Sequence, residues 1–80
     1  YEQIEECFSV KEREFIKKDQ SNFYYLWTRK EALAKCIGTG LTKEIISFEV
    51  LNDNVVYNGL SFMITTEKED NYFISACRKI

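Results

Sequence analysis

Residues 22–38 constrain the fold of this chain most, because their apolar side chains recur at helical spacing and the run ends at a glycine. On a helical wheel at about 100° per residue, one face gathers Phe23, Leu26, Trp27, Leu33, Ala34 and Ile37. Gly38 suits the left-handed conformation that commonly ends a helix. We therefore expect a helix from Asn22 to Ile37 whose apolar face is buried.

Lys30 lies at the centre of that apolar face, with Glu31 and Lys35 on its flank as an i, i+4 pair. The spacing leaves two interpretations open. In the first, Lys30 packs its stem on Trp27 and extends its ammonium to water, while Glu31 and Lys35 are an ordinary solvated pair and Gly38 is only a cap. In the second, the helix lines a cleft for an anion, because a desolvated ammonium needs a partner such as a phosphate, and the carboxylate could hold Mg²⁺.

Two shorter helices are predicted before this one. Residues 1–8 carry apolar side chains at helical spacing. Ser9 and Glu12 form a capping-box pattern, which would begin a second helix. Ser21 or Asn22 could then cap the third helix.

The second half of the chain changes to strand-like patterns separated by turn residues. Strands are expected at residues 45–51, 55–57, 60–66 and 72–77, with a charged turn at 67–71. Short turns between strands indicate an antiparallel sheet. The expected fold class is therefore α+β, with about three N-terminal helices followed by a three- to four-stranded antiparallel sheet.

Composition and charge exclude several function classes. Eleven basic and thirteen acidic residues give a net charge of −2, so neither nucleic acid nor a membrane surface is an expected partner. No apolar run approaches the roughly 20 residues that span a bilayer. The chain has no histidine, and Cys7, Cys36 and Cys77 lack C-x-x-C spacing, which disfavours a zinc site or a Cys-His nucleophile. We expect reduced thiols that fill core space in a cytoplasmic protein.

The segment Trp27–Leu41 resembles the helix motif W-x-x-K-E-A-x-x-K-x-x-G-x-G of the 4′-phosphopantetheinyl transferases. The matching positions are Trp27, Lys30, Glu31, Ala32, Lys35, Gly38 and Gly40. Upstream, Phe8–Glu12 resembles the F-S-x-x-E segment that precedes this motif in the family, and the strand-rich tail is also similar. Trp27 favours the surfactin-synthetase-type branch over the acyl-carrier-protein-synthase type.

The resemblance implies Mg²⁺-dependent transfer of the phosphopantetheine arm of coenzyme A to a serine of an acyl or peptidyl carrier protein. By position, Glu31 would be the Mg²⁺ ligand and a candidate base near the serine hydroxyl. Lys30 and Lys35 would contact the phosphates of coenzyme A, and the catalytic candidates are Glu31 and Lys35. Ser9 and Glu12 would support this site as a capping box.

One family feature is missing from these 80 residues, the G-x-D-x-E-like signature on a preceding strand, whose acidic residues supply further Mg²⁺ ligands. We therefore expect residues 1–80 to form a single half-domain, resembling the C-terminal half of the family fold and inactive alone if those ligands are required. The alternative is a non-catalytic α+β interaction module. It would associate through an uncovered sheet edge with a second copy, a partner half or a carrier protein.

Overall fold

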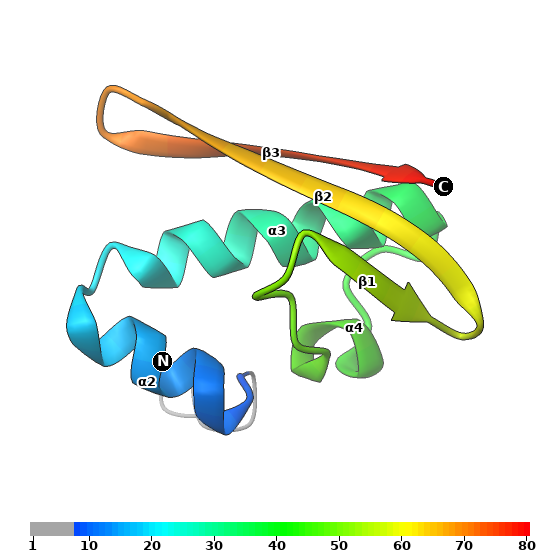
Figure 1. Cartoon of the computed structure of the whole chain (residues 1–80), viewed down its shortest axis with the longest axis horizontal. Coiled ribbons are helices and arrows are strands. Elements are labelled where there is room, and N and C mark those ends of the chain that lie inside the picture. Colours follow the sequence, from blue (N-terminus) through cyan, green and yellow to red (C-terminus); the bar gives the residue numbers. More distant parts are fainter. Residues whose placement is uncertain (1–7) are drawn as a thin grey trace.

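The computed structural model describes residues 8–80. Three helices precede three strands along this part of the chain, which confirms the expected α+β class (Figure 1). The elements are α2 (Val10–Lys18), α3 (Asn22–Ile37), α4 (Lys43–Ser47), β1 (Asn54–Tyr57), β2 (Leu60–Glu69) and β3 (Tyr72–Lys79). The helix predicted for residues 1–8 falls outside the described residues, except for Phe8, which is buried.

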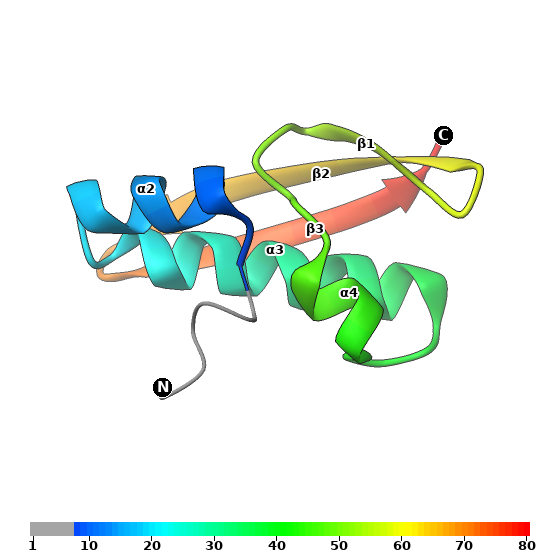
Figure 2. The ribbon, with the colours of Figure 1, turned by 90° about the horizontal axis from the view of Figure 1, so that it is seen from below.

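The sheet is antiparallel with strand order β1-β2-β3, and α3 lies across one of its faces (Figure 2). The β1–β2 turn is made by Asn58 and Gly59, whose φ angles of 52° and 78° are typical of a two-residue hairpin. Phe62 and Ile64 of β2 point toward the helices and are buried. The core therefore lies between α3 and the inner face of β2, as the alternation in the sequence predicts.

Local capping explains where α2 begins and where α3 ends. Both halves of the predicted capping box form, because the Ser9 hydroxyl accepts from the Glu12 N–H at 3.1 Å and the Glu12 carboxylate accepts from the Ser9 N–H at 3.0 Å. Gly38 ends α3 at a φ of 90°, and its N–H donates to the Ala34 carbonyl at 2.9 Å. The predicted bounds of α3 are confirmed, although the Ser21 side chain makes no capping bond to α3.

The strand predicted at residues 45–51 is wrong. Thr42 begins α4 there instead, since its hydroxyl accepts from the Ile45 N–H at 3.2 Å. Beyond α4, the N–H of Val50 donates to the Glu12 carboxylate at 2.8 Å, and its carbonyl accepts from Arg29 Nε at 2.7 Å. Side chains from α2 and α3 thus satisfy the backbone groups that a strand partner would otherwise satisfy.

The charged turn predicted at residues 67–71 is shorter in the structure. The β2–β3 pairing continues through Lys68 opposite Phe73 and Glu69 opposite Tyr72, which leaves Asp70 and Asn71 as the turn. The Lys68 ammonium lies 6.0 Å from the centre of the Phe73 ring. Cross-strand contacts of this kind stabilise the end of the hairpin. Residues 67–69 of β2 are charged and exposed, so no alternation of apolar and polar residues predicts that the strand continues there.

Candidate functional site

The Lys30 side chain is fully buried, so the interpretation in which it extends to water is wrong. Its ammonium lies 3.1 Å from Glu12 Oε1, donates to the Phe48 carbonyl at 2.7 Å, and sits 5.1 Å from the centre of the Phe8 ring. Glu12 is therefore the counter-charge for the desolvated ammonium. Sequence reasoning assigned Glu12 only to the capping box. Its place in the family-like segment Phe8–Glu12 is the signal that could have pointed to a contact with α3.

Glu12 connects three parts of the chain through one carboxylate. It is fully buried and accepts hydrogen bonds from the Ser9 N–H, the Lys30 ammonium and the Val50 N–H. Within residues 8–80, every buried side-chain nitrogen and oxygen has a hydrogen-bond partner. The ion pair is thus completed by backbone groups, and it fixes α2 and the segment after α4 against α3.

Arg29 is a second buried cation of α3, and no pattern in the sequence marks it. Its guanidinium donates to the carbonyls of Val50 and Asn52 at 2.7 and 2.9 Å, and to Thr66 Oγ1 at 2.8 Å. It also pairs with Asp53 at 2.9 Å. Arg29 and Lys30 together hold the segment between α4 and β1 in place. We call them the ion-pair side of α3.

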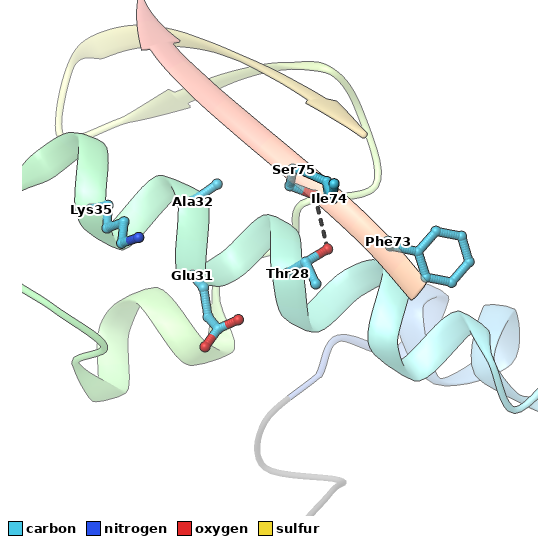
Figure 3. A pocket seen from close by; sticks show the side chains of 7 residues that line it. All are labelled: Thr28, Glu31, Ala32, Lys35, Phe73, Ile74 and Ser75. Atoms are coloured by element: carbon cyan, nitrogen blue, oxygen red, sulfur yellow. Dashed lines mark hydrogen bonds between the residues drawn. The ribbon is translucent and has the colours of Figure 1, made fainter. Parts of the chain in front are cut away.

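Glu31 and Lys35 lie on a different side of α3 from Lys30, as the helical wheel predicts, and both are exposed. They line a pocket of about 260 Å³ between α3 and β3, whose other lining residues are Thr28, Ala32, Phe73, Ile74 and Ser75 (Figure 3). A neighbouring hollow shares Lys35, Ala32 and Ser75 and continues to Cys36 and Cys77. We call these two hollows the α3–β3 groove. The structure therefore brings Glu31 and Lys35 together and places the ammonium of Lys30 elsewhere.

Glu31 can supply one ligand to a magnesium ion. Its carboxylate is exposed in the groove, and carboxylate oxygens are ligands that Mg²⁺ prefers. No group of three or more His, Cys, Asp or Glu side chains suited to a metal ion gathers among residues 8–80. Because Mg²⁺ is usually held by one or two carboxylates together with substrate phosphates and water, Glu31 fits as one ligand of a larger set.

The thiols of Cys36 and Cys77 are free and half-buried, and both pack against the core. Burial, with a hydrogen bond to Cys36, raises the pKa of Cys77 from 9.0 to about 12. Cys77 is therefore protonated at neutral pH, which disfavours a role as nucleophile or metal ligand. These two residues confirm the expected packing role of the cysteines, while Cys7 lies outside the described residues.

Comparison with models of protein families identifies the family of this chain. The model of the 4′-phosphopantetheinyl transferase superfamily matches residues 2–77, which includes both sides of α3 and almost all of the sheet. The chain belongs to this superfamily. No match was found among curated proteins or among solved structures. The family assignment made from Trp27–Leu41 is confirmed, and the surfactin-synthetase-type branch stays a prediction. No helix within residues 8–80 is long and apolar enough to cross a membrane.

Proposed function

We propose that the protein takes part in the Mg²⁺-dependent transfer of the 4′-phosphopantetheine arm of coenzyme A to a serine of an acyl or peptidyl carrier protein. Membership of the superfamily supports the reaction class. The observation that carries the proposal is the exposure of Glu31 and Lys35, one helical turn apart, in the same groove between α3 and β3. The Glu31 carboxylate and the Lys35 ammonium in one groove suit a site for a metal ion and the phosphates bound to it.

Each of the two residues has a distinct task in this proposal. Lys35 pairs its ammonium with a phosphate of coenzyme A, and its exposure lets it do so without breaking any buried contact. Glu31 would provide a metal ligand and accept the proton of the carrier serine as the serine oxygen attacks the phosphorus next to the pantetheine arm. The pyrophosphate P–O bond then breaks, and adenosine 3′,5′-bisphosphate leaves. When bound, Mg²⁺ neutralises phosphate charge and stabilises the transfer.

The role of Lys30 in phosphate binding stays a prediction. Its ammonium is enclosed by Glu12, the Phe48 carbonyl and the Phe8 ring, so a phosphate could reach it only if the ion pair opened. Opening would leave the Glu12 carboxylate buried without its counter-charge, which is costly. We therefore propose that Lys30 acts on the site by holding α3 in place, and that Lys35 carries the phosphate contact.

The proposal requires further oxygen ligands for the metal. Glu31 is the only carboxylate among the residues that line the groove within the described part of the chain. Substrate phosphates and water can supply some ligands. The acidic residues of the family's G-x-D-x-E-like signature, provided by another segment or another chain, would supply the rest.

Calorimetry with coenzyme A, with and without Mg²⁺, tests the assignment directly. We expect Mg²⁺ to strengthen binding to the parent protein and to Glu14→Gln, a matched control on the exposed surface of α2. Glu31→Gln, which removes the charge but keeps the shape, should lose that Mg²⁺ effect. If Glu31→Gln binds Mg²⁺–coenzyme A as well as the parent does, the site is assigned wrongly.

Transfer of labelled phosphopantetheine to an apo carrier protein tests the reaction itself. The assay is run with the protein alone and with an added segment that carries the G-x-D-x-E-like signature. We expect transfer to depend on the added segment, because Glu31 alone does not complete the metal site. Absence of transfer under both conditions, with coenzyme A binding intact, would favour the non-catalytic alternative.

The second candidate function is an interaction module, which the outer face of the sheet favours. Val56, Tyr72 and Ile74 share this face by their register and are 63%, 57% and 51% exposed. Among the described residues, β3 has a strand neighbour on one side only. Sedimentation discriminates between the two functions: a dimer that ignores coenzyme A supports the module, and a strict monomer that binds coenzyme A counts against it.

A further inference from the structure

A series of hydrogen bonds connects the buried Arg29 to the wall of the α3–β3 groove. Arg29 Nη1 donates to Thr66 Oγ1 at 2.8 Å, and Thr66 Oγ1 lies 2.8 Å from Ser75 Oγ on the neighbouring strand. Ser75 Oγ lies 2.8 Å from Thr28 Oγ1 on α3, the bond drawn in Figure 3. Thr28 in turn donates to the Tyr25 carbonyl at 3.0 Å.

The direction of every bond in this series follows from counting protons. Each hydroxyl has one proton to donate, and a carbonyl can only accept. The proton of Thr28 is used on Tyr25, so Ser75 must donate to Thr28, and Thr66 must then donate to Ser75. At the other end the guanidinium of Arg29 can only donate, which matches the acceptor role left to Thr66. The hydroxyls are therefore all oriented one way, from the buried cation toward α3.

This orientation determines what the groove wall offers to a ligand. Thr28 and Ser75 both line the groove, and neither has a proton left to donate. Each hydroxyl oxygen accepts one bond within the series and retains capacity to accept another. Reversing the series would take the Thr28 proton away from the Tyr25 carbonyl, and Thr66, then accepting from both Arg29 and Ser75, would have no partner in the series for its own proton. The wall is thus fixed as a hydrogen-bond acceptor.

Apolar side chains of Ala32 and Phe73 lie beside the two hydroxyls, while Glu31 and Lys35 form the charged part of the same pocket. Such a surface fits an alkyl chain that carries a neutral N–H or O–H group, because the chain covers the apolar part and the donor reaches the hydroxyls. A phosphate oxygen, which can only accept, would find no donor in Thr28 or Ser75. The charged and neutral parts of one ligand would therefore bind at different places, near Lys35 and near Thr28.

We propose that Thr28 and Ser75 form a subsite for a neutral N–H or O–H donor of the ligand. This inference rests on the proposed function, in which the donor is an amide of the pantetheine arm, an alkyl chain interrupted by amide groups. Thr28 lies at i−3 from Glu31 on α3, so the subsite adjoins the position assigned to the metal ion. The arm would then extend along the wall while Glu31 and Lys35 hold the charged end.

Paired calorimetry of coenzyme A and adenosine 3′,5′-bisphosphate, which lacks the arm, tests the subsite in the presence of Mg²⁺. The measured quantity is the ratio of the two dissociation constants, which is unaffected by partial unfolding because that lowers both apparent affinities equally. Thr28→Val and Ser75→Ala should each weaken coenzyme A about three- to tenfold relative to the bisphosphate, the effect of losing one neutral hydrogen bond. Thr28→Ser, which retains the hydroxyl, should keep the ratio of the parent.

The outcomes separate this inference from the function on which it rests. If the parent binds coenzyme A but Thr28→Val and Ser75→Ala leave the ratio unchanged, the subsite is wrong and the proposed function stands. An equal loss of affinity for coenzyme A and for the bisphosphate also overturns the subsite, since the hydroxyls would then affect the groove as a whole. If the parent binds neither ligand, the proposed function fails and the subsite with it.

Discussion

Two sides of α3 differ in environment: the ion-pair side with Arg29 and Lys30, and the side that faces the α3–β3 groove, with Glu31 and Lys35, which we call the groove side. Lys30 and Glu31 are neighbours of opposite charge, yet one is buried and the other is exposed. Arg29 and Lys30 are fully buried and are bound by groups from α2, β2 and the segment after α4. Glu31, the next residue, is exposed in the α3–β3 groove with Lys35. A step of about 100° around the helix separates the two environments.

The difference teaches that one family motif combines residues with separate tasks. In the run Lys30-Glu31, the lysine stabilises the position of the helix and the acid is available to a ligand. The family-like segment Phe8–Glu12 belongs with the first task, because its Glu12 is the buried partner of Lys30. Substitutions on the two sides should therefore separate stability from ligand binding.

The largest effect is expected when the buried pair is broken. Glu12→Gln and Lys30→Met should each lower the free energy of unfolding by about 3–5 kcal/mol, since each leaves one buried charge without its partner. The Glu12→Gln/Lys30→Met double variant should lose less than the sum of the two, with a coupling energy of about 1–3 kcal/mol. Urea denaturation of the four proteins measures this cycle.

The same cycle tests whether Lys30 contacts the ligand. Because the double variant removes both buried charges, we expect it to bind Mg²⁺–coenzyme A nearly as well as the parent once folded. If the double variant is stable but has lost coenzyme A binding, Lys30 reaches the phosphate after all. Strictly additive losses of stability would instead contradict the ion pair.

On the groove side, Lys35→Met should change ligand binding and leave stability within about 0.5 kcal/mol, as is usual for an exposed residue. Loss of a hydrogen bond to a charged phosphate predicts a coenzyme A affinity lower by about ten- to a hundredfold. Calorimetry at several salt concentrations should also show a weaker salt dependence, because one charge contact is gone. Lys11→Met, an exposed lysine on α2, is the matched control and should behave like the parent. If Lys35→Met and Lys11→Met lost the same coenzyme A affinity, the loss would be an effect of net charge, and Lys35 would not contact the ligand.

A smaller effect is expected from the cap that orders Glu12. Ser9→Ala removes the hydroxyl that accepts from the Glu12 N–H and donates to Glu49 at 2.7 Å, and should cost about 1 kcal/mol. Ser21→Ala is the matched control, because Ser21 precedes α3 without capping it, and it should cost less than about 0.5 kcal/mol. Thermal unfolding measures both. Equal costs would mean that the capping box does not support the ion-pair side.

Much of this arrangement could be predicted from the sequence, since it is encoded locally. Helical spacing and Gly38 give the bounds of α3, and Ser9 with Glu12 gives the start of α2. The wheel also gives the position of Glu31 and Lys35 on the flank of the apolar face. Each of these features depends on residues within a few positions of one another.

Most features that were missed depend on residues far apart in the chain. The expected strand at residues 45–51 is absent for two reasons: residues 45–47 belong to α4, which the local Thr42 cap begins, and Val50 pairs its backbone with Glu12 and Arg29, which lie 38 and 21 positions earlier. The partner of Lys30 and the hydroxyl series through Thr66 and Ser75 are likewise tertiary contacts. A periodic pattern predicts which face of a helix or strand is buried, but it does not predict which residues from elsewhere in the chain contact that face.

At neutral pH the smallest effect is expected from Cys77, at the far end of the groove, because its contribution to stability depends on pH only above about pH 9. Burial raises the pKa of Cys77 in the folded protein to about 12, above the value of 9.0 expected when the chain unfolds. Below pH 9 both states keep the proton, and between pH 9 and 12 only the folded state does. The folded state then binds more protons than the unfolded state, so stability falls as pH rises through this range.

Because Lys and Tyr side chains also titrate there, the measured quantity is the difference in unfolding free energy between the parent and Cys77→Ser at each pH. This difference should be constant below pH 9 and should shift against the parent above it. A difference that is constant throughout would mean that burial does not raise the pKa of Cys77.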